Sequence, residues 1–160
     1  MVDGNVSVSS ALIRHVRSRP LLLVFGSYLV VFTLLGWPWL HVAAHAIPGV
    51  TASTTARDGR LCVWLLAWVS HALGTDPARL VHANINYPAP AQLTSSEQLL
   101  SSQIAFAPLY LLTGNPVLAT NLTVFVSYPL AALAMERLLV AMGCGAAAAW
   151  ASAEVAAEGR

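Results

Sequence analysis

The sequence predicts an all-α, polytopic membrane protein, and two observations carry that prediction. Hydrophobic residues make up 57% of the 160 residues and charged residues only 9%, whereas a soluble globular domain carries about 25% charged residues. No fixed charge lies between Pro20 and Ala56, and a second uncharged run extends from Leu99 to Met135. Each run can supply helices that cross a hydrocarbon core of about 30 Å.

The first transmembrane helix is predicted over residues 20–40. Pro20 suits the first turn of a helix, and Trp37 and Trp39 suit the membrane interface at its far end. The apolar run is about 20 residues long, whereas the apolar core of a signal peptide has about 7–15. We therefore expect this segment to be retained as a membrane span.

Residues 1–19 are predicted as a cytoplasmic N-terminal tail. The tail has one Asp and three Arg, namely Arg14, Arg17 and Arg19. The positive-inside rule then places the N-terminus in the cytoplasm. The expected location is the cytoplasmic (inner) membrane, with a multi-pass topology.

Residues 41–94 are then predicted as one extracytoplasmic loop. It begins with a surface segment that turns at Pro48-Gly49, and it contains an apolar stretch predicted as a helix over 60–73. Its thirteen apolar-stretch residues, Leu61 to Leu73, span about 20 Å as a helix, too short to cross, so we expect a helix that lies along the membrane surface. Residues 74–94, rich in Pro, Asn and Gly, are expected to be irregular.

The second uncharged run is predicted to form two further spans. A single helix over the whole run would be roughly 55 Å long, nearly twice the hydrocarbon core. The turn sequence Thr113-Gly114-Asn115-Pro116 divides it into helices over 95–113 and 117–137. Glu136 and Arg137 would mark the end of the third span. A truncated helical tail, residues 138–160, would follow outside.

Asp58 is the first candidate for chemistry. It stands between Arg57 and Arg60 in a loop expected at the membrane surface. There a carboxylate can act as a general base or orient an acceptor hydroxyl or amine. The alternative is structural, because Asp followed by Gly59 and an apolar helix is a good N-cap.

Glu97 has the same two interpretations. It can bind a cation or a donor substrate at a cavity facing the membrane. It also completes a capping box with Thr94 at the start of the helix predicted over 95–113. The capping box requires no ligand, so the local sequence favours it.

Other polar and aromatic residues have structural explanations that compete with functional ones. Zinc needs three or four ligands of defined geometry. His41 and His45 lack a third ligand at motif spacing, so no metal site is predicted. Trp64 and Trp68 can stack against a sugar or anchor a helix at the interface. Asn121 is expected to hydrogen-bond a neighbouring helix or to line a cavity.

Composition also excludes several function classes. The net charge is +1 and no basic cluster is present, so a nucleic-acid partner is not expected. The sequence contains no Walker A loop, Gly-x-Gly-x-x-Gly or Gly-x-Ser-x-Gly motif. No cofactor is identified, and dependence on a divalent metal stays open. Cys62 and Cys144 have no spacing that supports a disulfide framework.

An ordered set of short motifs resembles the N-terminal part of bacterial polytopic membrane glycosyltransferases of the C-type (GT-C) superfamily. The resemblance covers about residues 15–150. The motifs are Asp58-Gly59-Arg60, Trp64-Leu65-Leu66-Ala67-Trp68, His71-Ala72-Leu73, Asp76-Pro77, Ala83-Asn84-Ile85-Asn86-Tyr87-Pro88, Ser96-Glu97 and Leu112-Thr113-Gly114-Asn115-Pro116.

The resemblance implies transfer of a sugar from a polyprenyl-phosphate donor to an acceptor outside the cytoplasmic membrane. By position, Asp58 matches the acidic residue that the family carries in its first extracytoplasmic loop, so it is the implied catalytic residue. The implied substrate-binding residues are Arg57, Arg60, Trp64, His71, Asn84, Tyr87 and Glu97.

This chain departs from the family in its number of spans. Family members usually have eight or more, and three are predicted here, so we expect the chain to be incomplete alone or to need a partner membrane subunit. The alternative is a non-catalytic small integral membrane protein that acts as a binding or scaffold subunit. A transporter fragment is disfavoured by the few ionisable residues within the predicted spans.

Overall fold

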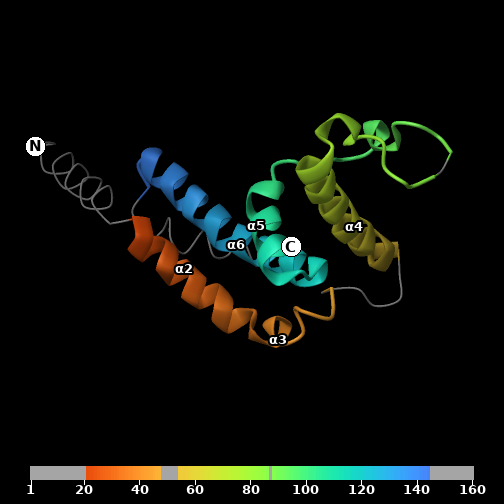
Figure 1. The fold of residues 1–160 in the computed structure, drawn as a ribbon. Coiled ribbons are helices and arrows are strands. Elements are labelled where there is room, and N and C mark those ends of the chain that lie inside the picture. Colours follow the sequence, from red (N-terminus) through yellow and green to blue (C-terminus); the bar gives the residue numbers. More distant parts are fainter. Residues whose placement is uncertain (1–20, 48–53, 87, 145–160) are drawn as a thin grey trace, which may run out of the picture. The chain divides into compact units, whose positions relative to one another are not determined.

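The computed structural model describes residues 21–47, 54–86 and 88–144, apart from the side chains of residues 54–57. This part of the chain is helical and contains no strand, which confirms the all-α prediction (Figure 1). The predicted tail over 1–19, the Pro48-Gly49 turn and the tail from residue 145 lie outside the described residues. The helices are α2 (Leu21–Leu35), α3 (Trp37–Leu40), α4 (Thr54–Thr75), α5 (Gln103–Thr113) and α6 (Pro116–Ala141), with 3₁₀ turns η1 (Pro77–Arg79) and η2 (Gln92–Ser95).

The chain divides into two units. The first comprises residues 1–37 and 125–160, and the second comprises residues 38–124. The division falls within α6, so that helix contributes to both. Each unit is described below by itself.

In the first unit, α2 and α6 pack as antiparallel neighbours. Val24 and Tyr28 share one face of α2 and pack with Ala132 of α6, as expected for positions four residues apart on a helix. One turn further on, the Phe32 ring stacks on Tyr128, with ring centroids 5.8 Å apart. Because contacts later in α2 meet residues earlier in α6, the two helices run in opposite directions.

The helix predicted over 20–40 is interrupted near its end. The N–H of Gly36 still donates to Phe32 O at 2.8 Å, but α2 ends at Leu35 and the short α3 completes the segment. Pro38 carries no N–H and so breaks the helical hydrogen-bond ladder. The 15 residues of α2 span about 22 Å, so a crossing by this segment stays a prediction.

Helix α6 is the one described helix long and apolar enough to cross a membrane. It has 26 residues and a length of about 39 Å. The helix predicted over 117–137 continues to Ala141. The expectation that Glu136 and Arg137 mark its end is therefore wrong, and Glu136 is buried with only 1% of its surface exposed.

The C-terminal end of α6 is set by a glycine. Gly143 has a left-handed φ of 89°. Its N–H donates to Val140 O at 3.0 Å, and the N–H of Cys144 donates to Leu139 O at 2.9 Å. These two bonds form a Schellman motif, which satisfies carbonyls that the helix end leaves unpaired.

The predicted turn between α5 and α6 is present, and local chemistry explains it. Gly114 follows α5 with a left-handed φ of 63°, and its N–H donates to Tyr110 O at 2.8 Å. Asn115 caps α6 because its Oδ1 accepts the N–H groups of Val117 and Leu118, both at 3.0 Å. Pro116 occupies the first helical position, where its missing N–H is not needed.

Substitution of Gly114 by Ala should destabilise the chain by about 1–2 kcal/mol, because an L-residue is strained at left-handed φ. No atom would crowd the added Cβ, so the cost is conformational. Gly74, within α4, also has open space around it, and Gly74→Ala should stabilise by up to about 1 kcal/mol. Thermal unfolding of both variants in detergent should show shifts of opposite sign; two shifts of the same sign would contradict the backbone argument.

Two asparagines connect this turn and the start of α6 to the segment after α3. Asn121 is 2% exposed, and its Nδ2 donates to Ala43 O at 2.6 Å and Ala46 O at 2.7 Å. Asn115 Nδ2 donates to Ala44 O at 2.9 Å. Asn121 does form hydrogen bonds, but the predicted partner, a neighbouring helix, is wrong, because both acceptors are loop carbonyls.

Helix α4 is longer than the helix predicted over 60–73. It begins at Thr54 and has 22 residues, so Asp58 lies inside it. The predictions of a loop around Asp58 and of an N-cap there are therefore wrong. Gly59 weakens a helix by about 1 kcal/mol, and packing of the following apolar face overrides that cost: Leu65 and Val69 are buried against Ala83 and Leu93.

The helix predicted over 95–113 begins only at Gln103. Ser96 is extended, with φ −131° and ψ 166°, and Leu99 has a φ of 50°, so the chain between them cannot continue a helix. The hydroxyl of Thr94 donates to Ala91 O at 2.7 Å. The predicted capping box of Thr94 and Glu97 is therefore wrong. The irregular structure expected over 74–94 begins only after Thr75, where α4 ends, and its described residues are irregular apart from the two 3₁₀ turns.

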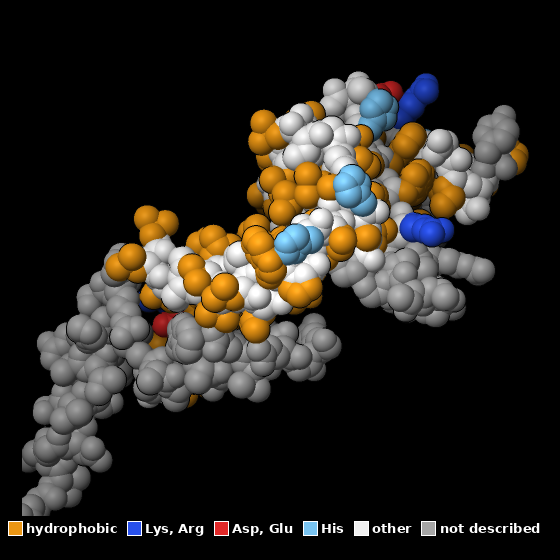
Figure 2. Space-filling view, turned by 90° about the horizontal axis from the view of Figure 1, so that it is seen from below, with side chains coloured by type: hydrophobic (Ala, Val, Ile, Leu, Met, Phe, Trp, Pro, Cys, Tyr) orange, Lys and Arg blue, Asp and Glu red, His pale blue; other side chains and the backbone are white. Residues whose placement is uncertain are grey.

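Large apolar side chains are exposed in both units. Figure 2 shows hydrophobic side chains over much of the described surface on one face. The most exposed of them is Leu22 on α2 (83%) in the first unit and Ile104 on α5 (84%) in the second. Extended apolar surface of this kind marks contact with a membrane or a partner.

Candidate functional site

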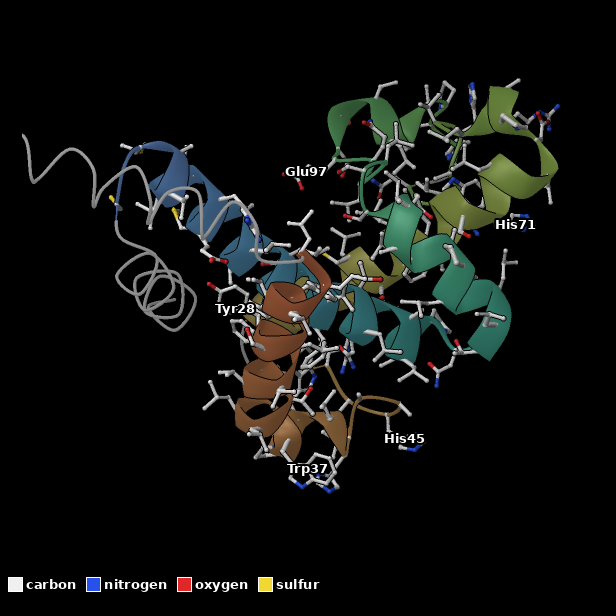
Figure 3. The ribbon with its side chains drawn as sticks, turned by 90° about the vertical axis from the view of Figure 1, so that its left-hand side faces the viewer. Tyr28, Trp37, His45, His71 and Glu97 are labelled. Atoms are coloured by element: carbon white, nitrogen blue, oxygen red, sulfur yellow. The ribbon has the colours of Figure 1, made fainter. Side chains whose placement is uncertain are left out.

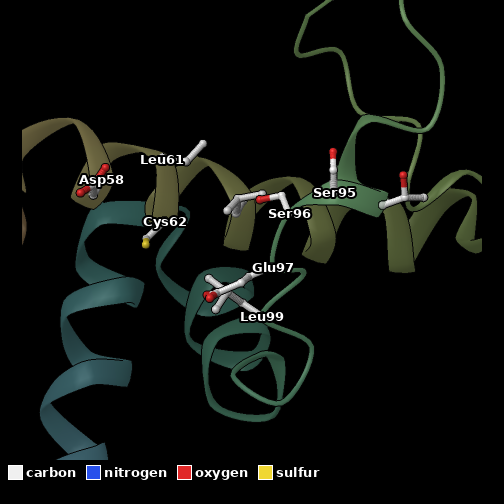
Figure 4. A pocket seen from close by; sticks show the side chains of 9 residues that line it. Asp58, Leu61, Cys62, Ser95, Ser96, Glu97 and Leu99 are labelled. Atoms are coloured by element: carbon white, nitrogen blue, oxygen red, sulfur yellow. The ribbon is translucent and has the colours of Figure 1, made fainter. Parts of the chain in front are cut away.

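An open pocket of about 560 Å³ lies between α4 and the segment that follows η2, within the second unit. It brings together Asp58 and Glu97, the two acidic residues that the sequence singles out (Figure 4). The lining residues are Asp58, Leu61, Cys62, Leu65, Thr94, Ser95, Ser96, Glu97 and Leu99.

Helix α4 supplies one wall through positions spaced three and four residues apart. Asp58 and Cys62 stand one turn apart on the same face, as do Leu61 and Leu65. Leu65 is buried, whereas Asp58 and Cys62 are exposed. This wall therefore exposes a carboxylate and a thiol next to the apolar side chains of Leu61 and Leu65.

The facing wall is held by a buried leucine and a side-chain amide. Leu93 is 1% exposed and packs against Leu65, and its N–H donates to Val81 O at 3.1 Å. The Gln98 amide donates to Leu93 O and, at 2.8 Å, to Ser96 O. These bonds fix the turn that carries Glu97. Sequence reasoning missed Gln98, although its two partners lie only five and two residues before it.

The polar groups of the pocket are mainly hydrogen-bond acceptors. Thr94 and Ser95 donate their hydroxyl protons to Ala91 O at 2.7 Å and Gln92 O at 3.2 Å, so their oxygens remain available to accept. Ionised Asp58 and Glu97 can only accept. The pocket therefore suits a ligand rich in hydroxyl or amine donors.

Among the described residues, no group of three or more His, Cys, Asp or Glu side chains is placed to hold a metal ion.

Both carboxylates act on the thiol of Cys62. Partial burial raises the pKa of Cys62, and the negative charges of Glu97 and then Asp58 raise it further. Like charges nearby disfavour a thiolate. Figure 4 shows Cys62 between the two carboxylates in that view. Cys62 was not predicted as a site residue, although its position one turn after Asp58 is visible in the sequence.

Cys62 offers a direct test of this geometry. Glu97→Gln removes a negative charge, lowers the pKa of Cys62 and raises the thiolate fraction at neutral pH, so alkylation by neutral iodoacetamide should accelerate. Asp58→Asn should have a smaller effect, since Glu97 is the larger of the two charge contributions. The rate is measured by mass spectrometry of the peptide, with exposed Cys144 as the internal control. An unchanged rate in Glu97→Gln would mean that Glu97 does not face Cys62.

Among the arginine and tyrosine positions proposed for substrate, only Arg60 has a described side chain, and it is not among the residues that line this pocket. The Arg57 side chain and Tyr87 lie outside the described residues. Arg60 is exposed on α4, about 200° around the helix from Asp58. Arg60 therefore faces away from the pocket wall.

Trp64 is partly buried and packs against the core cluster of the second unit. It stacks on Trp68 with ring centroids 6.1 Å apart and an interplanar angle of 15°. Both rings pack against the cluster of Leu65, Val69 and Leu93, and Trp68 Nε1 donates to Leu80 O at 3.1 Å. This packing explains the tryptophans without a bound sugar.

His71 and Asn84 are also separate from the pocket. His71 is exposed on α4, about 20 Å along the helix axis from Asp58. Figure 3 shows His71 well apart from Glu97. Asn84 is exposed in the loop after η1. Of the eight predicted site residues, the pocket brings together Asp58 and Glu97.

Comparison with protein-family models, curated proteins and solved structures finds no match to this chain.

Proposed function

We propose that this chain is the N-terminal membrane portion of a GT-C-like glycosyltransferase that moves a sugar from a polyprenyl-phosphate donor to an extracytoplasmic acceptor. The observation that carries the proposal is the pocket shared by Asp58 and Glu97. The order of motifs that resembles this superfamily is the second support. The proposed location is the cytoplasmic membrane, with several spans and the N-terminus in the cytoplasm.

The chemistry of the pocket assigns different roles to the two carboxylates. Asp58 takes the proton of the acceptor hydroxyl as that oxygen bonds to the anomeric carbon of the sugar. The bond between that carbon and the phosphate oxygen breaks, and polyprenyl phosphate leaves with the electron pair. Glu97 accepts hydrogen bonds from sugar hydroxyls. The donor's phosphate lies outside this acidic pocket, because two carboxylates repel it.

The exposed apolar side chains and the long apolar α6 support a membrane location. Apolar surface of this extent is costly in water. A lipid-linked donor would therefore reach the second unit by diffusion within the bilayer.

A non-catalytic scaffold subunit is the alternative function. In that interpretation Asp58 serves only as a helix cap. Because Asp58 lies inside α4, it cannot cap the start of that helix, and this interpretation leaves its place beside the pocket unexplained.

Transfer of radiolabelled sugar from polyprenyl phosphate tests the proposal. The Asp58→Asn substitution is introduced at the chromosomal locus, so that the full chain is produced together with any partner subunits. Lipid-linked sugar should accumulate and acceptor labelling should fall in that strain. Equal labelling in the variant and parent strains would remove the catalytic assignment.

A further inference from the structure

We infer that α5 does not cross the membrane but lies in its interface, with one apolar face in lipid, and that residues 41–115 all remain on one side. This inference depends on a membrane crossing by α6. It does not depend on sugar transfer.

The two faces of α5 differ sharply. Ile104, Leu111 and Leu112 are 84%, 82% and 83% exposed, and with exposed Pro108 they form a stripe at positions i, i+4, i+7 and i+8. This spacing defines one face of a helix. The stripe is wholly apolar and belongs to a helix with no charged residue.

The opposite face of α5 is anchored in the second unit. Phe106 is fully buried with Leu66 of α4 and Ala119 of α6, and Gln103 Nε2 donates to Leu66 O at 3.1 Å. Phe106 also contacts the Tyr110 ring, with centroids 5.4 Å apart. The orientation of the exposed stripe relative to α4 is therefore fixed.

Hydrogen bonds near the start of α6 determine how many crossings the intervening chain can make. Asn115 binds Ala44 O, and Asn121 binds Ala43 O and Ala46 O. These direct bonds place the turn before α6 on the same side of the membrane as residues 43–46. The chain between them must then cross an even number of times.

Neither of the two intervening helices, α4 and α5, can cross the membrane, so the number of crossings is zero. The 11 residues of α5 span about 16 Å, roughly half the hydrocarbon core. Helix α4 carries Arg57, Asp58 and Arg60 and is not apolar enough to be a candidate span. This inference therefore replaces the sequence prediction that residues 95–113 form a membrane span.

A lipid surface is the occupant that fits the stripe. Helix α5 ends at Thr113 and α6 begins at Pro116, so a crossing α6 holds the end of α5 at the boundary between lipid and water. Leu111 and Leu112 are the stripe residues nearest that boundary in the chain. An uncharged apolar face at this depth inserts among the acyl chains and gains the transfer free energy of its side chains.

Labelling of single cysteines tests the topology. In the full chain with Cys62→Ser and Cys144→Ser, the substitutions His45→Cys and Thr113→Cys place thiols at two exposed positions. Sealed vesicles of known orientation are treated with a membrane-impermeant maleimide. Both thiols should react from the same side. Reaction from opposite sides would mean that α5 crosses and would overturn the inference.

Lipid contact is tested with a polarity-sensitive fluorophore on Leu112→Cys, and on Ser101→Cys as an exposed control outside the stripe. Brominated phospholipids should quench the Leu112 probe and leave the Ser101 probe bright. An unquenched Leu112 probe, as expected if water or a second protein covers the stripe, would overturn the lipid assignment.

Carbonate extraction separates this inference from the proposed function. Release of the chain from membranes would refute the crossing by α6, and both proposals would fail together. A retained chain with opposite-side labelling refutes only the placement of α5. A retained chain with same-side labelling and no dependence of transfer on Asp58 refutes only the catalytic proposal.

Discussion

Asp58→Asn should lower the rate of sugar transfer by about 10²–10⁴-fold, the usual contribution of a general base. Asparagine keeps the size of the side chain but cannot take the acceptor proton. Because Asp58 is exposed on the wall of an open pocket, the substitution leaves no buried group without a partner. The expected loss is therefore in the rate, and the amount of folded chain in the membrane should be unchanged. Single-turnover transfer in isolated membranes measures the rate.

Asp76→Asn is the matched control, since it makes the same change on an exposed carboxylate of the same unit. Asp76 pairs with Arg79 at 3.5 Å on the surface, and such pairs contribute about 0–1 kcal/mol. Its transfer rate should match that of the parent chain. Equal losses in the two variants would show that a general change in charge, and not the position of Asp58, causes the effect.

The parts of the fold that sequence predicts well are those set by adjacent residues. The turn at Gly114, Asn115 and Pro116 is one example, because each residue has its own conformational reason and the capping bonds join residues only two or three positions apart. The apolar composition of α6 is another, because its length and the absence of charge before Glu136 are direct properties of the sequence.

The starts of α4 and α5 differ from the sequence prediction because local signals compete with distant contacts. Asp58-Gly59 and the pair Thr94 and Glu97 both match helix-start patterns. The segment that carries Thr94 and Glu97 does not start a helix. Burial of Leu93 against α4 and the hydrogen bonds of Gln98 hold it in an irregular turn. The packing of Leu93 against Leu65 joins residues far apart in sequence, and a pattern over four residues cannot reveal it.

The candidate site depends on the same distant contacts. Asp58 and Glu97 each stand out in their own neighbourhoods, but their meeting in one pocket follows from the packing of Leu65 against Leu93. The tryptophans depend on distant contacts as well. Trp64 and Trp68 match the pattern of an interfacial anchor, which stays a prediction, and their partly buried rings pack against the cluster that contains Leu93.

Asn121→Ala should destabilise the chain by about 2–4 kcal/mol, because it removes the donor for two carbonyls in one substitution. Both bonds are short, 2.6 Å to Ala43 O and 2.7 Å to Ala46 O, and Asn121 is 2% exposed. The control variant Asn84→Ala makes the same change at an exposed asparagine, and it should change stability by less than about 0.5 kcal/mol. Thermal unfolding in detergent compares the two.

Asn121→Asp separates the lost donor from the lost volume. Aspartate has nearly the shape of asparagine, but an ionised carboxylate has no proton to donate and places negative charge beside two carbonyl oxygens. If the amide donor is what stabilises the segment at 43–46, Asn121→Asp should be at least as destabilising as Asn121→Ala. It should also expose that segment to protease. A stability equal to that of the parent chain would show that packing, and not these hydrogen bonds, holds the start of α6 against residues 43–46.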